Sequence, residues 1–134
     1  MKKGRMCSII ALAALLVLGA AIWASADDWV LLGTRTVALG ADRDEIWVGE
    51  GMGTFKAIKL HVVDRGVEFD RLLVAFRNGR TVEAGIRAFI PAGGYTRDID
   101  LPGRERFISR VVMYYTTRPG TLDRAVVEVW GLRD

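Results

Sequence analysis

Apolar and polar residues alternate with a period of two in much of the chain after residue 28. Ile58, Leu60 and Val62 occupy one set of alternate positions, and Lys59 and His61 occupy the other. Successive side chains of a β-strand point to opposite faces of a sheet, so this pattern predicts a strand with one buried face. Segments 86–90 and 124–130 alternate in the same way, and no segment in this part of the chain has the period of an amphipathic helix.

Turn-forming residues separate the apolar segments at fairly regular spacing, as in Asp64-Arg65-Gly66 and Pro102-Gly103. Short strands divided by such turns are typical of sandwiches and barrels. We therefore expect an all-β fold: a single antiparallel β-sandwich of about eight strands, jelly-roll-like in topology and similar to the galactose-binding sandwiches. The segments expected to form strands are 29–32, 36–39, 45–48, 55–63, 71–77, 81–90, 96–101, 107–116 and 125–130.

Three local signals refine this expectation. Asn78-Gly79 lies between two apolar segments and predicts a two-residue hairpin turn with positive φ at both positions. Phe55 and Ala57 are out of phase with Ile58, which predicts a β-bulge. Segment 107–116 has apolar side chains at consecutive positions, as expected of a central strand.

The first 26 residues have the features of a signal peptide: a positive start, an uncharged apolar stretch and a small-x-small cleavage motif. These are Lys2, Lys3 and Arg5, residues 9–22, and Ala24-Ser25-Ala26, respectively. We expect a helical signal peptide over 1–26 and one β-sandwich domain over 27–134, exported to the periplasm or the extracellular medium. The alternative is an uncleaved leader retained as an anchor, although the apolar stretch is shorter than the roughly 20 residues that a spanning helix needs.

The charge balance changes when the leader is set aside. The whole chain has 19 Lys and Arg residues against 16 Asp and Glu residues, a net charge of +3. Lys2, Lys3 and Arg5 account for this excess, so residues 27–134 are formally neutral. A neutral domain has no overall attraction to nucleic acid or to an anionic membrane, and we expect neither as a partner. Cys7 is the only cysteine, and it precedes the apolar stretch, which disfavours lipidation and leaves the domain without a disulfide.

Several short motifs together resemble a known family. They are Leu31-Leu32-Gly33, Asp42-x-Asp44-x-Ile46, Phe55-x-x-Ile58-x-Leu60, Ile99-Asp100-Leu101, Arg106-x-Ile108 and Ala125-x-Val127-x-Val129-x-Gly131. Through these motifs the chain is similar to the small exported bacterial proteins grouped as domain of unknown function 2541. The resemblance would cover nearly all of residues 27–134. It implies a bacterial, exported protein and carries no catalytic residue over to this chain.

Residues suited to nucleophilic catalysis are scarce. Residues 27–134 contain one serine, Ser109, and one histidine, His61, and a hydrolase triad would need both of them in contact with an orienting group. We expect instead that Ser109 lies within a strand and that His61 lies on the solvent face of its strand. Asp98 and Asp100 could form an acid/base pair, but the exposed face of a strand accounts for them better. We therefore predict no catalytic residues and no enzyme activity.

Two segments are weak candidates for metal or phosphate binding. Asp42, Asp44 and Glu45 offer the oxygen ligands that Ca²⁺ prefers, although a polar loop that caps a strand is the favoured interpretation. The run Gly49-x-Gly51-x-Gly53 lacks the spacing of a dinucleotide-binding loop and precedes a strand. We interpret this run as a flexible hairpin loop with Met52 exposed at its tip. We expect no cofactor and no bound metal.

Aromatic side chains are the best candidates for ligand binding. Trp47, Tyr95, Tyr114 and Trp130 would offer flat faces to a sugar or a peptide, although most aromatic residues of a small β domain belong to its core. The leading hypothesis is a non-enzymatic binding or interaction module of the bacterial cell envelope, with a carbohydrate or another envelope protein as its partner. The alternatives are an assembly accessory protein that pairs through an edge strand and, less favoured, a hydrolase.

We predict cleavage of the leader after Ala26, because Ala24 and Ala26 flank Ser25 directly after the apolar stretch. Mass spectrometry of the exported protein should give Asp27 as its first residue. Retention of the full-length chain in the inner membrane would contradict cleavage and support the anchor.

Overall fold

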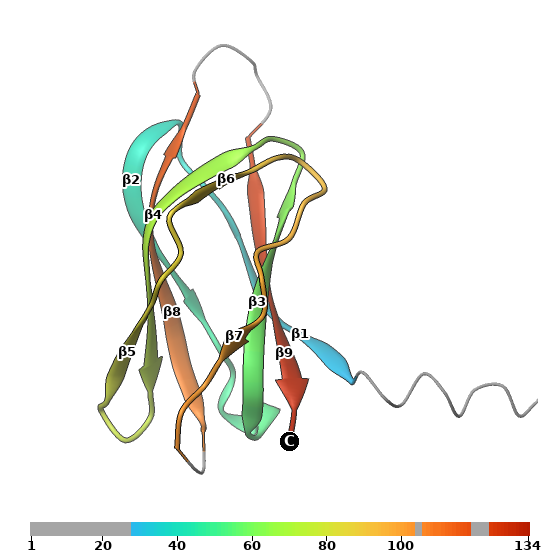
Figure 1. Ribbon diagram of the computed structural model, residues 1–134, viewed down its shortest axis with the longest axis vertical. Coiled ribbons are helices and arrows are strands. Elements are labelled where there is room, and N and C mark those ends of the chain that lie inside the picture. The colour runs from blue at the N-terminus through green and yellow to red at the C-terminus, as the bar shows by residue number, and fades with distance from the viewer. Residues whose placement is uncertain (1–27, 104–105, 119–123) are drawn as a thin grey trace, which may run out of the picture.

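Two antiparallel sheets face each other in the computed structural model, which describes residues 28–103, 106–118 and 124–134 (Figure 1). The expected signal peptide, with Ala24 and Ala26, lies outside the described residues. One sheet has the strand order β1-β9-β3-β7, and the other has the order β2-β8-β4-β5, with β6 also paired to β4. The elements are β1 Trp29–Thr36, β2 Gly40–Trp47, the 3₁₀ turn η3 Glu50–Met52, β3 Phe55–Val63, β4 Val67–Phe76, β5 Thr81–Ala84, β6 Ala88–Ile90, β7 Ile99–Asp100, β8 Ile108–Thr117 and β9 Val126–Arg133.

This strand order is that of a jelly roll. Both β5 and β6 pair with β4, so the two form the broken halves of one strand, and the sandwich then has eight strands. Early strands pair with late ones: β1 with β9, β2 with β8, β3 with both β7 and β9, and β4 with β8. Such nested antiparallel pairing is the double Greek key of the jelly roll. The predicted β-sandwich of about eight strands is therefore confirmed.

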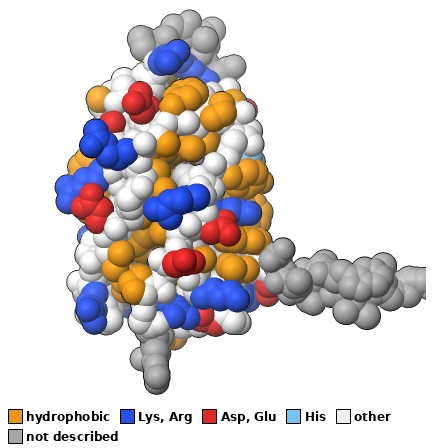
Figure 2. Space-filling view, viewed as in Figure 1, with side chains coloured by type: hydrophobic (Ala, Val, Ile, Leu, Met, Phe, Trp, Pro, Cys, Tyr) orange, Lys and Arg blue, Asp and Glu red, His pale blue; other side chains and the backbone are white. Residues whose placement is uncertain are grey.

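The hydrophobic core lies between the two sheets. Ile58, Leu60 and Val62 of β3 are fully buried, and Val127 and Val129 of β9 pack beside them, as the alternation predicts. Removing such apolar surface from water stabilises the fold by roughly 25 cal/mol per Å². The outside of the sandwich mixes acidic, basic and apolar side chains, and neither sign of charge dominates the view in Figure 2. This mixture agrees with the neutral charge balance of residues 27–134.

Two further local expectations are confirmed. The register of β3 against β9 shifts between Phe55 and Ala57, so the predicted bulge is present. The Arg106 guanidinium supports it by donating from Nε to the Phe55 carbonyl over 2.8 Å. Strand β8 lies between β2 and β4, and consecutive residues Val111 and Val112 are both buried, as predicted for a central strand.

The first strand boundaries were predicted wrongly. Segment 36–39 does not form a strand of its own, because β1 continues to Thr36 and the chain then crosses to the other sheet. Side chains of β8 fix this crossing: the Ala38 N–H donates to the Tyr115 hydroxyl over 2.8 Å, and the Gly40 N–H donates to Thr117 Oγ1 over 2.9 Å. Strand β2 therefore begins earlier than expected, at Gly40. Hydrogen bonds between residues 77 positions apart leave no local signal in the sequence.

Segment 81–90 is interrupted, although one strand was predicted there. Residues 85–87 separate β5 from β6, and Ala88 is exposed. Only Ile86 and Ile90 of the predicted apolar face are buried. Segment 96–101 likewise contributes only the two residues of β7. Thr96 lies beside β3 but outside any strand. Its side chain makes the contact, because Thr96 Oγ1 accepts the Leu60 N–H over 3.0 Å.

The Asn78-Gly79 turn connects β4 to β5, but its loop has three residues rather than two. The Phe76 N–H donates to the Arg80 carbonyl over 2.8 Å, and the Gly79 N–H donates to the Phe76 carbonyl over 3.0 Å. Gly79 has φ +91°, whereas Asn78 is not among the described residues with positive φ. A turn that closes on a left-handed glycine is the common three-residue hairpin loop. Asn78 stabilises it differently, because its Oδ1 accepts the Arg80 N–H over 2.9 Å.

We predict that Gly79→Ala lowers the free energy of unfolding by about 1–2 kcal/mol, because an L side chain is strained in the left-handed region. A Cβ at Gly79 would meet no atom within 4 Å, so strain and not collision causes the loss. Gly51→Ala is the matched control, since a Cβ there also meets nothing within 4 Å and the φ of Gly51 is not positive. Denaturant unfolding compares the two variants, and equal midpoints would contradict the assigned turn.

Candidate functional site

Aromatic and polar side chains gather on the outer surface of the four-stranded sheet. Strand pairing brings them together: His61 lies opposite Glu128, Lys59 opposite Trp130, and Leu31 also opposite Trp130. Each alternates along its strand with core residues, so these side chains lie on the face away from the core. We call this set the aromatic face; it consists of Trp29, Leu31, Lys59, His61, Tyr95, Glu128 and Trp130.

Glu128 is the polar centre of the aromatic face. Its Oε1 lies 2.8 Å from His61 Nδ1 and accepts the Trp130 indole N–H over 3.1 Å. The hydrogen bond with His61 is the largest cause that lowers the pKa of Glu128, and the bond from Trp130 is the second. A carboxylate only accepts hydrogen bonds, so we assign the proton to His61 Nδ1. The other ring nitrogen, Nε2, forms no hydrogen bond with any residue that the structure describes.

Lys59 is held between aromatic rings. Its Nζ lies 4.2 Å from the ring centroid of Trp29 and 4.8 Å from that of Tyr95. The Tyr95 ring stacks on His61 with centroids 4.2 Å apart and an interplanar angle of 14°. The stack is not sealed from solvent, because 52% of Tyr95 and 41% of Leu31 remain exposed. The aromatic face is therefore an ordered and accessible cluster.

The structure separates the four aromatic residues predicted to stack on a ligand. Tyr95 and Trp130 join the aromatic face, whereas Trp47 and Tyr114 lie on the other sheet. Trp47 is 62% exposed with the Arg110 guanidinium 5.2 Å from its centroid. The Tyr114 ring has the guanidinium groups of Arg43 and Arg71 at 5.8 and 5.6 Å, so arginines already occupy these surfaces.

Sequence reasoning missed Trp29, Lys59 and Glu128 as members of the site. All three lie on the polar side of the alternation, so their outward direction could have been inferred. Their contacts depend on the pairing of β9 with both β1 and β3, which strand periodicity alone does not reveal.

The predicted acidic cluster is not brought together. Asp42, Asp44 and Glu45 lie within β2 and not in a loop, so the interpretation as a capping loop is wrong. A strand sends Asp44 and Glu45 to opposite faces. Asp44 pairs with Arg35 at 3.0 Å, and Glu45 pairs with Arg43 at 2.8 Å. Throughout the described ranges, no group of three or more His, Cys, Asp or Glu side chains could hold a metal ion.

Asp44 has a structural partner in Tyr115. The buried Tyr115 hydroxyl donates to Asp44 Oδ2 over 2.6 Å while it accepts the Ala38 N–H. Burial is the largest cause that raises the pKa of Tyr115, and the bond to Asp44 adds to it. Tyr115 therefore stays neutral and joins β8 to the crossing between β1 and β2.

The residues considered for catalysis are dispersed. Ser109 lies on β8 in one sheet, and His61 lies on β3 in the other, where Glu128 and Tyr95 engage it. Asp98 and Asp100 are both exposed, beside and within the short strand β7. This arrangement places His61 on the outer side of its strand, as expected from the sequence.

The glycine-rich segment is more ordered than expected. Residues Glu50–Met52 form the 3₁₀ turn η3, and Met52 is half-buried against the core, so the predicted exposed tip is wrong. Arg77 Nη2 donates to the Glu50 carbonyl over 2.6 Å, and Arg133 Nη1 donates to the Met52 carbonyl over 3.1 Å. These two arginines are far away in sequence, which is why a local reading treated the segment as flexible.

A family model described as a domain of unknown function, DUF2541, matches residues 10–131. The chain belongs to the DUF2541 family. This assignment confirms the resemblance found in the sequence motifs. Because the family description states no activity, the DUF2541 chain must be interpreted from its own residues.

Curated proteins and solved structures give no further family for this chain. Among curated proteins, none matches this DUF2541 chain. Among solved structures, the crystal structure of the SPBc2 prophage-derived protein YomS is similar, with 11% sequence identity and a TM-score of 0.45. That similarity covers 89% of this chain and 98% of YomS. Within the described part of the DUF2541 chain, no helix is long and apolar enough to cross a membrane.

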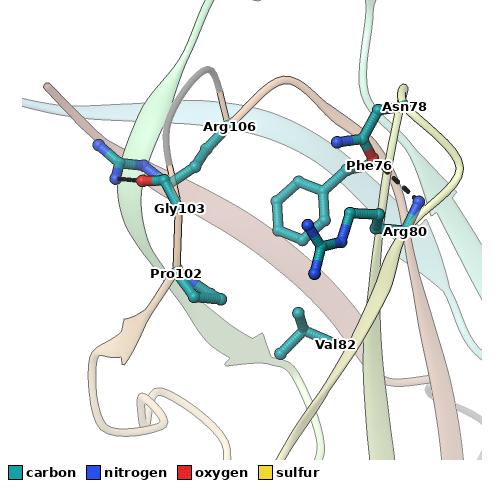
Figure 3. A pocket seen from close by; sticks show the side chains of 7 residues that line it. All are labelled: Phe76, Asn78, Arg80, Val82, Pro102, Gly103 and Arg106. Atoms are coloured by element: carbon teal, nitrogen blue, oxygen red, sulfur yellow. Dashed lines mark hydrogen bonds between the residues drawn. The ribbon is translucent and has the colours of Figure 1, made fainter.

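A pocket of about 150 Å³ lies apart from the aromatic face, between the β4–β5 hairpin and the loop after β7 (Figure 3). Its lining residues are Phe76, Asn78, Arg80, Val82, Pro102, Gly103 and Arg106. The Arg106 guanidinium is already engaged by the carbonyls of Phe55 and Gly103 and by Asp134. Arg106 therefore holds the loop and Asp134 in place, which is a structural role.

We predict that His61→Phe raises the pKa of the Glu128 carboxyl towards its usual value of 4.5, because the strongest stabilising hydrogen bond is lost. Phe retains a ring that can stack on Tyr95. Trp130→Phe is the matched variant and should give a smaller rise, since Trp130 is the second cause. Carboxyl ¹³C NMR titration measures both.

The hydrogen bond between Glu128 and His61 also makes the free energy of unfolding depend on pH. A folded pKa below the unfolded one contributes stability that is present above about pH 4.5 and is lost as pH falls through the folded pKa. This acid-dependent loss should be smaller in His61→Phe. A Glu128 titration that His61→Phe leaves unchanged would show that the hydrogen bond is absent in solution.

Proposed function

We propose that this chain is an exported, non-enzymatic binding module of the bacterial cell envelope and that the aromatic face binds a carbohydrate. The observation that carries the proposal is the combination of aromatic rings and fixed hydrogen-bonding groups on one accessible sheet surface. Trp29, Tyr95 and Trp130 supply the rings, and Lys59, His61 and Glu128 supply the polar groups.

Carbohydrates have the chemistry that matches this surface. One face of a pyranose ring is made of C–H groups, which pack against aromatic rings, and its rim carries hydroxyl groups. The Glu128 carboxylate would accept from ligand hydroxyls, and the Lys59 ammonium would donate to ligand oxygens. These groups are already held by the His61 and Trp130 hydrogen bonds and by the Trp29 ring, so binding would cost little ordering entropy.

Binding without hydrolysis is supported by the state of Glu128. A glycosidase needs two carboxyl groups flanking the bond, one of them an acid with a raised pKa. The aromatic face contributes one carboxyl group, Glu128, and its pKa is lowered. An ionised carboxylate suits hydrogen bonding to a ligand better than proton donation.

Pairing through an edge strand is less well supported. Edge strand β2 carries four consecutive charged residues, 42–45, which discourage pairing with another chain, while β7 and β5 have two and four residues. Edge strand β1 has eight residues, as β2 has, but Arg35 is engaged by Asp44 of β2. Gly33 of β1 also lies against β2, since a Cβ there would meet Trp47 O at 3.1 Å.

We predict that Trp29→Ala weakens binding of the recognised glycan by about fivefold, because an aromatic stacking surface of this kind is worth roughly 1 kcal/mol. Trp47→Ala is the matched control, because Trp47 is an exposed tryptophan on the other sheet. An array of bacterial surface glycans, followed by calorimetry on the positive members, measures the effect. Equal losses in the two variants, or no glycan bound by the parent chain, would contradict the proposal.

A further inference from the structure

We infer that the carbohydrate bound by the aromatic face is acidic: a sugar with a carboxylate group, such as a hexuronic acid, that pairs with Lys59. This inference rests on the proposed function and adds the ligand class. It depends on one feature of the site, which is a fixed positive charge that no carboxylate of the described residues neutralises.

Lys59 differs from the arginines of the described residues that pair with carboxylates. Six arginines of the described chain pair with carboxylates: Arg35, Arg43, Arg71, Arg106, Arg110 and Arg133. Lys59 forms no ion pair and no side-chain hydrogen bond with any residue that the structure describes. Its contacts are the rings of Trp29 and Tyr95. The positive charge of Lys59 is therefore positioned but not neutralised.

The aromatic rings hold the ammonium in place without using up its donors. Attraction of an ammonium to a ring face is electrostatic and fixes its position. The three N–H groups of a lysine ammonium remain able to donate to oxygen atoms. A carboxylate on the ligand would satisfy both the charge and the donors, and a hydrogen bond between two charged groups is about twice as strong as a neutral one.

Glu128 indicates why the ligand is a sugar acid and not a simple anion. Its negative charge is held by His61 and Trp130 on the same face, and it would repel a second anion while accepting hydroxyl groups. Exposed Asp98 and Asp100 on the adjoining β7 segment disfavour a densely charged polyanion. A sugar with one carboxylate and several hydroxyls matches Lys59 at one end and Glu128 at the other.

Binding of galacturonate and glucuronate oligosaccharides and of their methyl esters tests this inference. The ester has the same ring and hydroxyl groups but no charge, so it isolates the carboxylate. We expect the parent chain to bind one acid about tenfold more tightly than its ester, a preference that salt reduces. The preference should fall to near unity in Lys59→Met, which keeps an apolar side chain of similar length. Lys56→Met is the control and should retain it, because Lys56 is exposed and lies outside the aromatic face.

The outcomes separate the two proposals. Equal binding of acid and ester by the parent chain would overturn the inference and leave carbohydrate binding in place. Failure to bind any uronate oligosaccharide or its ester would also overturn the inference, and the glycan array then decides the proposed function. An undiminished preference in a folded Lys59→Met variant would overturn the pairing of the ligand carboxylate with Lys59. If Lys59→Met does not fold, Lys59→Gln replaces it as the uncharged variant, and the same loss or retention of the preference decides.

Discussion

The pairing of β3 with β9 is the constraint on which both the core and the aromatic face depend. In this register Leu60 lies opposite Val129 inside the sandwich, while His61 lies opposite Glu128 outside it. Because side chains alternate between faces, a slip of one residue would turn the buried valines to solvent and separate His61 from Glu128. The register that buries the apolar side chains therefore also places the outward polar side chains, such as His61 and Glu128, in contact.

Close packing around β9 reinforces this register. A Cβ at Gly131 would lie 2.7 Å from Phe55 Cδ1 and 2.8 Å from Leu32 Cδ1, so only glycine lets these two core side chains approach the strand. The neighbouring strands β1 and β3 supply Leu32 and Phe55, which means that all three strands of the aromatic face share one packing arrangement. The strands that carry the surface cluster are consequently held by the packing of the core beneath them.

The sequence predicted the fold class well because a period of two is a local property. Ile58, Leu60 and Val62 could be assigned to the core, and the bulge before them could be found, from their spacing alone. The crossing between β1 and β2 could not be predicted, because Tyr115 and Thr117 fix it from β8. The break between β5 and β6 was missed because the alternation of Ile86, Ala88 and Ile90 continues past it, although Ala88 is exposed.

The candidate site was predicted only in part. Tyr95 and Trp130 were identified by residue type, but the same criterion also selected Trp47 and Tyr114, which lie on the other sheet beside arginines. Acidic residues 42–45 looked like a ligand cluster in sequence, yet a strand divides neighbours between two faces. Residue type identifies the candidate binding residues, but only the strand register shows which of their side chains lie in contact.

A two-dimensional NMR titration of the tryptophan indole N–H signals tests the central claim most directly. Trp29 and Trp130 belong to the aromatic face, and Trp47 reports on the opposite sheet within the same molecule. On addition of a bound uronate oligosaccharide, the account predicts that the Trp29 and Trp130 signals shift together and saturate at one concentration while the Trp47 signal stays in place. A shift confined to Trp47 would contradict it.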